Sequence, residues 1–369
     1  MNSKPAASGL SYGHRATPEH AENAVRQALD KSGLKRANAV LLFLTPEYAA
    51  DPEPALRAAA RAAGCLQVIG ATAAGIITEQ EWVLDSPGAA AMVFGNPIQL
   101  ALPSAARTTD DELVLSLCTP SGLDADWLDI PSRRFGAVSG DLFGRGPFKV
   151  WNGARVSDAE RVDSILLGVD GAISTSQGVR ALTSPIEVAE VQGHDIKRLG
   201  NYPALSVLVQ SLPLPIHEME QTPLDHLMCG VTFGDPLTAI RDGRYRLNPI
   251  LSANPRDQSI TLAQRLSPGE RLFWAMRDAL TAERDMRSNI ERAGKELAGD
   301  PDFAFLFPCI GRGPHFYGNR DRDLDNLKSR FPGLPIIGMY GNGELGPLDG
   351  ANHLYQYSTV LGLFKAKAV

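Results

Sequence analysis

Short apolar runs, each closed by glycine, proline or a polar turn, recur along most of the chain. The run at 39–44 (AVLLFL) is followed by a Thr-Pro pair, which predicts a buried strand. The alanine-rich segment 54–63 ends at Gly64 and predicts a helix, and 66–70 predicts a second buried strand. A strand, a helix and a strand at this spacing indicate a crossover unit in a sheet with parallel strands.

Two further helices are predicted from signals at their ends. The first begins at the Thr-Pro pair at 17–18, which supplies an N-cap and a first helical residue, and ends at Gly33. The second begins with Ser267 and Glu270 as a capping box and continues to about Leu297. It is long enough to form a spine or a dimer contact.

The middle of the chain, 86–257, consists mostly of short apolar segments separated by glycine, proline and aspartate. This pattern predicts strands with tight connections, and the Asn-Gly pair at 152–153 predicts a hairpin. The last part returns to a strand at 303–308, a helix at 321–331 and a strand at 334–340, with one or two strands after them.

The two ends of the chain resemble each other. Gly70 and Gly75 follow one short buried strand and are five residues apart, as are Gly338 and Gly343 after another, and a similar phrase occurs at 135–141. We therefore predict an α/β fold, with a mixed α+β fold as the alternative. It would consist of two pseudo-repeated halves whose mixed sheets are flanked by helices. The competing interpretation is that a strand followed by glycine is common in any α/β chain.

Composition limits the classes of function. The chain has 369 residues, of which 44% are hydrophobic and 21% charged, which fits two or three globular domains. A net charge of −6 argues against nucleic acid and against an anionic membrane surface. The first residues contain no apolar signal region, no apolar run is long enough to cross a membrane, and the four cysteines are far apart. We expect a cytoplasmic protein with reduced thiols.

The order and spacing of several phrases resemble the FIST-domain family. The phrases are VLLFLTPEY (40–48), VIGATAAGII (68–77), FGAVSGDLF (135–143), VWNGARVSD (150–158), the segment 171–205, FLFPCIGRG (305–313), PIIGMYGNGELGP (335–347) and the late His353. The resemblance implies a FIST N-terminal domain at 17–210, after a flexible N-terminus at 1–16, and a FIST C-terminal domain at 211–369.

Family membership implies a sensory role with small ligands, amino acids among them. Some members resemble haem-binding nitric-oxide sensors that act on histidine kinases or cyclic-dinucleotide enzymes. Such proteins often carry glutamate after the glycine of the first repeat, where this chain has Ile76, whereas the second repeat keeps Glu344. A polar ligand site is therefore expected in the C-terminal copy.

Five residues near the C-terminal strands are the first candidates for that site. Cys309, Arg312 and Gly313 follow one predicted strand, and Gly343 and Glu344 follow another. Ligands bind beyond the carboxyl ends of strands in open α/β sheets, so parallel neighbours would bring these residues into one cleft. The guanidinium could hold a carboxylate and the glutamate an amine, which suits an amino acid. The structural alternative is an Arg312–Glu344 ion pair that ties two loops together.

Two further candidates are less specific. Ser139 and Asp141 would line a second pocket in the N-terminal half, although an ordinary turn explains them as well. Cys309 could act as a nucleophile with His315 as its base, in a hydrolase or a transferase. No orienting third residue is evident in the sequence, and a buried, inert thiol is the competing interpretation.

The histidines permit a haem hypothesis. Any of the seven could be an axial ligand of a non-covalently bound haem, and His353 and His315 are the first choices because they lie near the predicted cleft. The leading functional hypothesis remains a non-enzymatic sensor that binds a small molecule and contacts a signalling protein, with a homo-oligomer as a possible assembly. The alternatives are a haem-based nitric-oxide sensor and the cysteine-dependent enzyme.

Overall fold

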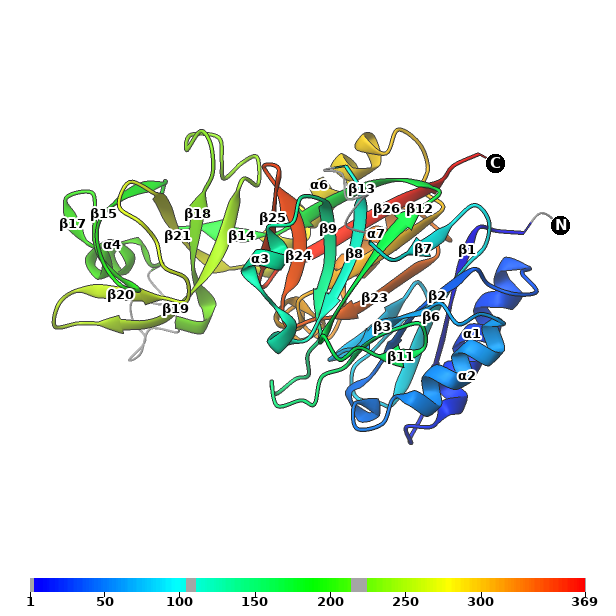
Figure 1. Ribbon diagram of the computed structural model, residues 1–369. Helices are drawn as coiled ribbons and strands as arrows, with labels where there is room; N and C mark the ends of the chain where they lie inside the picture. The colour runs from blue at the N-terminus through cyan, green and yellow to red at the C-terminus, as the bar shows by residue number, and fades with distance from the viewer. Residues whose placement is uncertain (1–2, 104–110, 214–223, 369) are drawn as a thin grey trace. The chain divides into compact units, whose positions relative to one another are not determined.

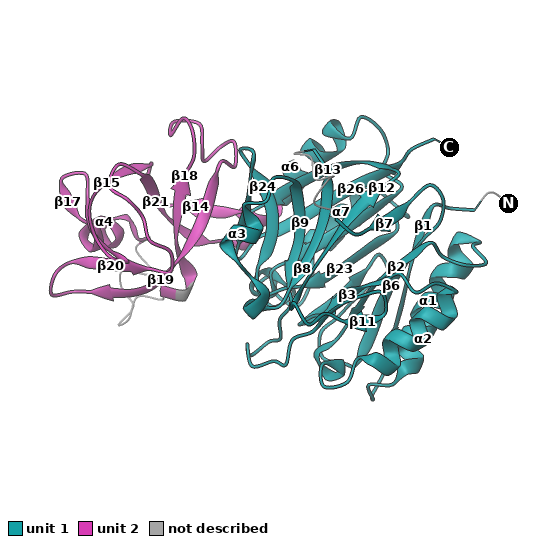
Figure 2. Cartoon of the chain, in the orientation of Figure 1, with its two compact units in different colours: residues 1–176, 286–369 teal, residues 177–285 magenta. Residues whose placement is uncertain are grey.

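The structure is a computed structural model that describes residues 3–103, 111–213 and 224–368 (Figure 1). The chain forms two compact units, which Figure 2 shows in separate colours. Unit 1 consists of residues 1–176 and 286–369, and unit 2 consists of residues 177–285. These units do not follow a division at residue 210, which stays a prediction.

Unit 1 contains three six-stranded sheets. In order across each sheet, sheet 1 has β1 (Ala6–Tyr12), β6 (Gly88–Phe94), β2 (Ala39–Leu44), β3 (Val68–Thr72), β10 (Val150–Asn152) and β11 (Arg155–Val156). Sheet 2 has β7 (Gln99–Ala101), β12 (Arg161–Leu167), β8 (Leu113–Cys118), β9 (Arg133–Val138), β24 (Glu344–Leu348) and β25 (Ala351–Tyr355). Sheet 3 has β13 (Val169–Ser176), β26 (Thr359–Ala366), β22 (Phe303–Pro308), β23 (Ile336–Tyr340), β4 (Gly75–Thr78) and β5 (Trp82–Val83).

The three sheets share one pairing pattern. In each, only the third and fourth strands are parallel, and every other pair is antiparallel. The strands that complete each sheet come from a different part of the chain. After β3 the chain enters sheet 3, after β23 it enters sheet 2, and after β9 it returns to sheet 1. The expected repeat of two halves is not confirmed, because the same order occurs three times.

One glycine occupies the same register position in each parallel pair. Gly70 lies opposite Leu42, Gly136 opposite Ser116, and Gly338 opposite Leu306. A Cβ atom on any of these glycines would lie within 1.9 Å of the carbonyl oxygen of the residue opposite. The recurring strand-then-glycine phrase in the sequence therefore has a steric cause, since only glycine lets the two backbones approach this closely.

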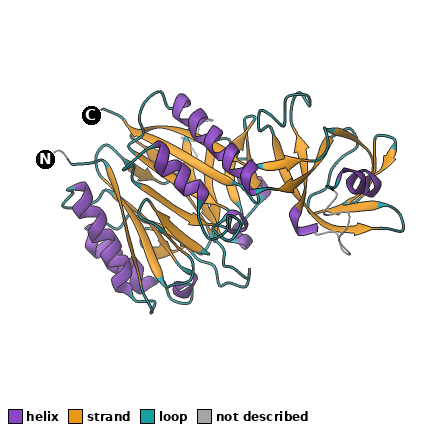
Figure 3. Ribbon diagram, turned by 180° about the vertical axis from the view of Figure 1, so that it is seen from behind, coloured by secondary structure: helices purple, strands orange, loops and turns teal. Residues whose placement is uncertain are grey.

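Helices cover the outer faces of sheets 1 and 3 (Figure 3). The helices of unit 1 are α1 (Pro18–Ser32), α2 (Glu53–Ala63), the short α3 (Ala125–Leu128), α7 (Arg322–Arg330) and the main part of α6 (Ala279–Glu296), with 3-10 turns η1 (Pro46–Tyr48), η2 (Pro120–Gly122) and η4 (Ile310–Arg312). Inner faces of all three sheets share one apolar core, in which the Phe135 ring lies 6.1 Å from Phe305. The prediction of mixed sheets flanked by helices is confirmed.

Unit 2 is a second sheet structure with its own core. Its elements are β14 (Val179–Ala181), β15 (Ile186–Gln192), β16 (Asp195–Leu199), β17 (Tyr202–Pro203), α4 (Ala204–Ser211), η3 (Leu224–His226), β18 (Leu227–Thr232), β19 (Tyr245–Asn254), β20 (Ser259–Leu262) and β21 (Arg271–Arg277). Six antiparallel strands close into a ring because β21 pairs with both β15 and β18. Trp274 and Leu208 lie in the core of this unit.

Most local predictions agree with the structure, but two do not. The helix predicted from Ser267 is wrong in its first part: the Ser267 backbone N–H donates to Glu270, 2.5 Å away, yet strand β21 follows and α6 begins only at Ala279. Burial of Leu272 and Trp274 in the core of unit 2 overrides the capping signal. The segment expected to be flexible forms β1, which pairs with β6 along its whole length because Leu10 and its small neighbours are buried.

Two further local predictions are confirmed, the second with its turn shifted by one residue from the Asn-Gly pair. Gly33 ends α1 in a left-handed conformation with φ of 72°, and the hairpin of β10 and β11 turns through Gly153 and Ala154, with φ of 63° and 59°. Positive φ at both central positions is the geometry of a type I′ turn. No helix in the described part of the chain combines the length and the apolarity needed to cross a membrane.

Candidate functional site

The carboxyl ends of the parallel strands β22 and β23 bring the two predicted loops together. Cys309 directly follows β22 and forms a parallel bridge with Gly341, which follows β23. The Gly341 backbone N–H donates to the Pro308 carbonyl at 3.0 Å. Cys309, Arg312 and Glu344 all lie in this region and are all buried, with exposed fractions of 6%, 2% and 0%.

Arg312 is held by Asp323 rather than by Glu344. Its Nε lies 3.0 Å from Asp323 Oδ2 and its Nη2 lies 3.2 Å from Asp323 Oδ1. The same guanidinium donates to the backbone carbonyl of Ser176 at 2.9 Å and to its hydroxyl at 2.7 Å. The Asp323 carboxylate also accepts from Tyr317 at 2.8 Å and Thr359 at 2.7 Å. The proposed ion-pair partner was therefore wrong, and the guanidinium already has acceptors on all three nitrogens.

Glu344 is a fully buried acid. Its Oε2 accepts from the Ser358 hydroxyl at 3.0 Å, whereas Oε1 is buried and has no hydrogen-bond partner among the described residues. Burial raises the pKa of Glu344 well above its usual value, against the opposing effect of hydrogen bonds from Ser358 and Cys309. Burial therefore favours the neutral form of this carboxyl over the ionised form.

The other sheets have aliphatic residues at the position of Glu344. Glu344 pairs with Ala137 at the edge of β9, and the corresponding pairs are Ile76 with Met339 and Val150 with Ala71. Ile76 and Val150 belong to the central apolar core. The architecture therefore does not require an acid at the position of Glu344. This makes Glu344 a candidate functional residue.

A third buried acid, besides Glu344 and Asp323, lies next to this cluster. Asp321 caps the start of α7 by accepting from the Leu324 backbone N–H at 2.9 Å, and the Tyr340 hydroxyl donates to its other carboxylate oxygen. Burial, with a smaller effect from the neighbouring Asp323 charge, raises the pKa of Asp321 to about 7. The sequence analysis missed Asp321, Asp323 and Ser358. The one available signal was the pair of acids at the start of the predicted helix 321–331.

Cys309 lies beside Glu344. Burial raises the pKa of the Cys309 thiol, and the Glu344 carboxyl adds to the effect. A thiol that stays protonated is a poor nucleophile, and His315, its suggested base, is on an exposed part of the loop after η4. The geometry gives no support to a catalytic role for this cysteine.

The remaining predicted residues have structural contacts. Ser139 Oγ donates to the Thr72 carbonyl at 2.5 Å, and Asp141 accepts from the backbone N–H groups of Phe143 and Gly146, both at 2.7 Å. Partial burial acts to raise the pKa of Asp141, but these amides hold it below its usual value. The carboxylate orders the loop that follows it.

Two predicted glycines also fit close packing. A Cβ atom on Gly343 would lie 2.9 Å from the Leu354 side chain, and one on Gly313 would lie 3.2 Å from the Ile310 carbonyl oxygen. Both positions therefore keep backbone segments close together near the Glu344 carboxyl.

The surroundings of the two candidate haem ligands do not fit a haem. His315 is exposed, and His353 is half-buried on β25 with its ring 6.2 Å from the Tyr355 ring. A haem needs a large apolar cavity beside its axial ligand, and no histidine lines the three cavities described for this structure. Within the described ranges, no cluster of three or more histidine, cysteine or acidic side chains could hold a metal ion.

Comparison with known families agrees with this architecture. Residues 38–201 match the FIST N domain and residues 204–347 match the FIST C domain. The chain belongs to the FIST-domain family. FIST domains are small-ligand sensory domains, and both domains of the family are present in the order that the sequence phrases predicted.

Similar proteins include several without an assigned role. An uncharacterized protein of Mycobacterium tuberculosis (strain H37Rv) is 30% identical over 250 residues, which cover 66% of this chain and 65% of that protein. An uncharacterized protein of Mycobacterium bovis is 30% identical over 230 residues, covering 62% of this chain and 59% of its own length. Human F-box only protein 22 is 40% identical over 43 residues, 11% of each chain. The matched residues thus cover less than two thirds of the length of these mycobacterial relatives.

Proposed function

We propose that this FIST protein is a cytoplasmic sensor whose small ligand binds the Glu344 carboxyl, and which signals by contact with another protein without catalysis. One observation carries the proposal: Glu344 is fully buried, and its Oε1 has no partner in the described structure. A buried, half-satisfied carboxyl costs about 1–3 kcal/mol of stability. Proteins tolerate such a cost mainly at functional sites.

The chemistry of the cluster favours a ligand with an amine. Arg312 is already held by Asp323, so a ligand carboxylate could reach the guanidinium only by displacing that buried partner. Glu344 is free to accept. The positive charge of a ligand ammonium group would favour ionisation of the carboxyl. Glu344 would then release its proton to solvent and pair with the ligand as a carboxylate. An amino acid bound through its amino group remains the proposed ligand class.

Binding would act through the loops around the cluster. Cys309 precedes η4, Gly343 precedes Glu344, and Ser358 precedes β26, so a ligand at the carboxyl would contact three separate connections at once. Tyr357, in the last of these loops, has a φ of 56°, a backbone conformation that a non-glycine residue seldom adopts. A ligand that shifts these loops would change the surface offered to a partner. A histidine kinase or a cyclic-dinucleotide enzyme is the proposed partner class.

The first experiment identifies the ligand. Native mass spectrometry of freshly purified protein reports any co-purified small molecule, and a panel of the common amino acids is then tested by thermal shift on wild type, Glu344→Leu and Glu291→Gln. Glu291 is an exposed control that pairs with Arg330. We expect stabilisation by one or more amino acids in wild type and in the control, and none in Glu344→Leu. Equal shifts in all three proteins would place the site elsewhere.

Calorimetry tests the proton transfer. At pH 7 the binding enthalpy of the identified amino acid should differ between phosphate and Tris buffers, because about one proton is released for each ligand bound. Binding with no proton release would show that the ligand does not ionise Glu344.

A further inference from the structure

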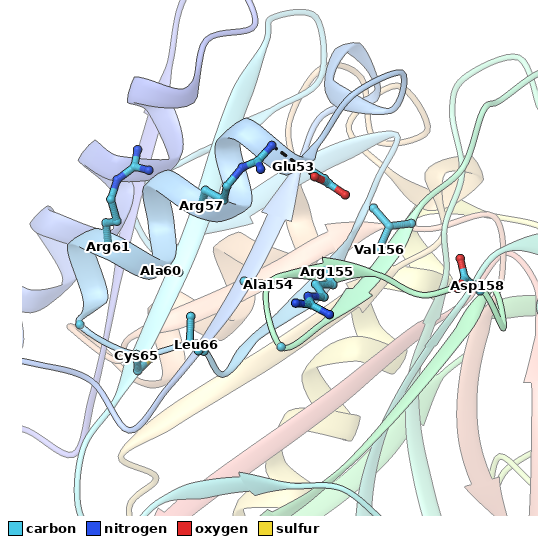
Figure 4. A pocket seen from close by; sticks show the side chains of 12 residues that line it. Glu53, Arg57, Ala60, Arg61, Cys65, Leu66, Ala154, Arg155, Val156 and Asp158 are labelled. Atoms are coloured by element: carbon cyan, nitrogen blue, oxygen red, sulfur yellow. Dashed lines mark ion pairs between the residues drawn. The ribbon is translucent and has the colours of Figure 1, made fainter.

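A second feature lies on the outer side of sheet 1 and includes none of the residues of the candidate site. A cavity of about 930 Å³ lies between α2 and the β10–β11 hairpin. In Figure 4, Arg57 and Arg61 extend from α2 on one side, and Ala154, Arg155 and Val156 belong to the hairpin on the other. Small residues give the cavity its depth; they are Ala60, Gly64, Gly153 and Ala154.

Three arginines and two acids, Glu53 and Asp158, line this cavity. Arg57 pairs with Glu53 at 3.2 Å, but Arg61 and Arg155 have no ion-pair partner in the described part of the chain. Both are exposed. Asp158 is exposed as well, so three arginines outnumber two acids there, whereas the protein as a whole carries a net charge of −6. Such a surface attracts an acidic partner.

The cavity also has an apolar contact and a free strand edge. Leu66 lines it and is 75% exposed, which is unusual for a large aliphatic side chain. β11 is the last strand of sheet 1, with no further strand beside it in the described ranges. Asn152 and Arg155 form the pair next to the turn, and the Ser157 N–H donates to the Val150 carbonyl. By the antiparallel alternation, the backbone N–H and C=O of Val156 between them point outward.

We propose that this groove binds an acidic, extended segment of a partner protein. The segment would add a short strand beside β11 by pairing with the outward N–H and C=O of Val156. Its acidic side chains would pair with Arg61 and Arg155, and an apolar side chain between them would cover Leu66. This docking surface does not depend on the ligand site at Glu344.

Fluorescence anisotropy tests the proposal with two labelled decapeptides. The acidic probe alternates glutamate and serine around a central Val-Leu pair, and the basic probe has lysine in place of glutamate. We expect the acidic probe to bind and the basic probe not to bind, with affinity falling steeply between about 0.05 M and about 0.3 M salt. Failure of the acidic probe to bind at the lower salt, or equal binding of both probes, overturns the proposal.

Charge reversal locates the binding. Arg61→Glu with Arg155→Glu should lower the affinity at least tenfold, whereas reversing Arg15 and Arg256, two exposed arginines outside the cavity, should leave it within twofold. Equal effects of the two double variants overturn the proposal.

Two further measurements separate an added strand from a simple anion site. Val156→Pro removes the outward donor and should weaken binding, with the thermal midpoint measured alongside to show that the fold is kept. Inorganic pyrophosphate should not displace the probe at matched ionic strength. Displacement by pyrophosphate, or full affinity in a folded Val156→Pro, would show a small-anion site in place of peptide docking.

Discussion

The Asp323 carboxylate of α7 accepts two hydrogen bonds from the Arg312 guanidinium of η4, and both side chains are almost completely buried. This ion pair fixes the start of α7 to the loop after β22. The pair thus supports the fold around Glu344 and is not available as a carboxylate receptor for a ligand.

Removing one member of this pair should destabilise unit 1. Arg312→Ala leaves the Asp323 charge buried without its partner, and we expect a loss of about 3–5 kcal/mol in the free energy of unfolding. Because both side chains are almost completely buried, this change acts on the fold and not on ligand binding alone. Urea unfolding followed by circular dichroism measures the effect. Arg320→Ala, which breaks an exposed ion pair with Asp325, is the matched control and should cost less than about 1 kcal/mol.

Stability should fall as the pH rises between about 4 and 7. The pKa of Asp321 is raised to about 7 in the folded protein, above its value of about 4 in the unfolded chain, so the folded state binds more protons across that range. The contribution is complete below about pH 4 and is lost as the pH rises through 7. Asp321→Asn, which keeps an N-cap side chain, should flatten the dependence of the unfolding free energy on pH. An unchanged slope in this variant would contradict the assignment.

Replacing Glu344 by leucine should stabilise the protein while it abolishes ligand binding. The two equivalent positions hold Ile76 and Val150, so the site already accommodates an aliphatic side chain in the other sheets. We expect a gain of about 1–3 kcal/mol, from removal of the unsatisfied carboxyl. The reverse change, Ile76→Glu, should destabilise by a similar amount or more. A large loss of stability in Glu344→Leu would mean that the acid has a structural role.

The cysteines should differ in their reactivity toward iodoacetamide. Cys65 is half-buried, whereas Cys118, Cys229 and Cys309 are buried. Burial also raises the pKa of the Cys309 thiol, which keeps it in the unreactive protonated form. Mass spectrometry after limited labelling of the native protein should therefore find Cys65 modified first. Rapid, selective labelling of Cys309 would instead support the hypothesis of a cysteine-dependent enzyme.

The sequence predicted local elements well and the partners of buried charges poorly. Strand β22 and helix α7 could be placed because an apolar run and an acidic helix start are local signals. That Arg312 would select Asp323 over Glu344 could not be predicted, because the choice depends on how η4 and α7 pack in three dimensions. Glu344 stood out in the sequence because Ile76 occupies the same place in the other repeat, and this comparison also holds in the register of the sheets.

The sequence predicted two repeats and not three, although the phrase at 135–141 contains the glycine of the third. Gly136 lies in the same steric position as Gly70 and Gly338, but its neighbour in the parallel strand is Ser116, not leucine, and only a very short helix, α3, connects the two strands. The three pairs thus share a backbone requirement without sharing the residue opposite the glycine. Changing any of the three glycines to alanine should therefore cost at least about 1–3 kcal/mol, whereas Gly294→Ala, in α6 with its nearest neighbour 3.5 Å away, should be neutral or stabilising. Thermal unfolding of the four variants tests this.

The exchange of strands among the three sheets has a consequence for biosynthesis. β26 lies between β13 and β22, and β24 and β25 complete a sheet whose other strands are made much earlier. While the chain is being synthesised, the sheets of unit 1 would have unpaired strand edges until these C-terminal strands emerge from the ribosome. We infer that unit 1 closes in a single late event, whereas unit 2, whose ring is built from one continuous segment, can close while synthesis continues.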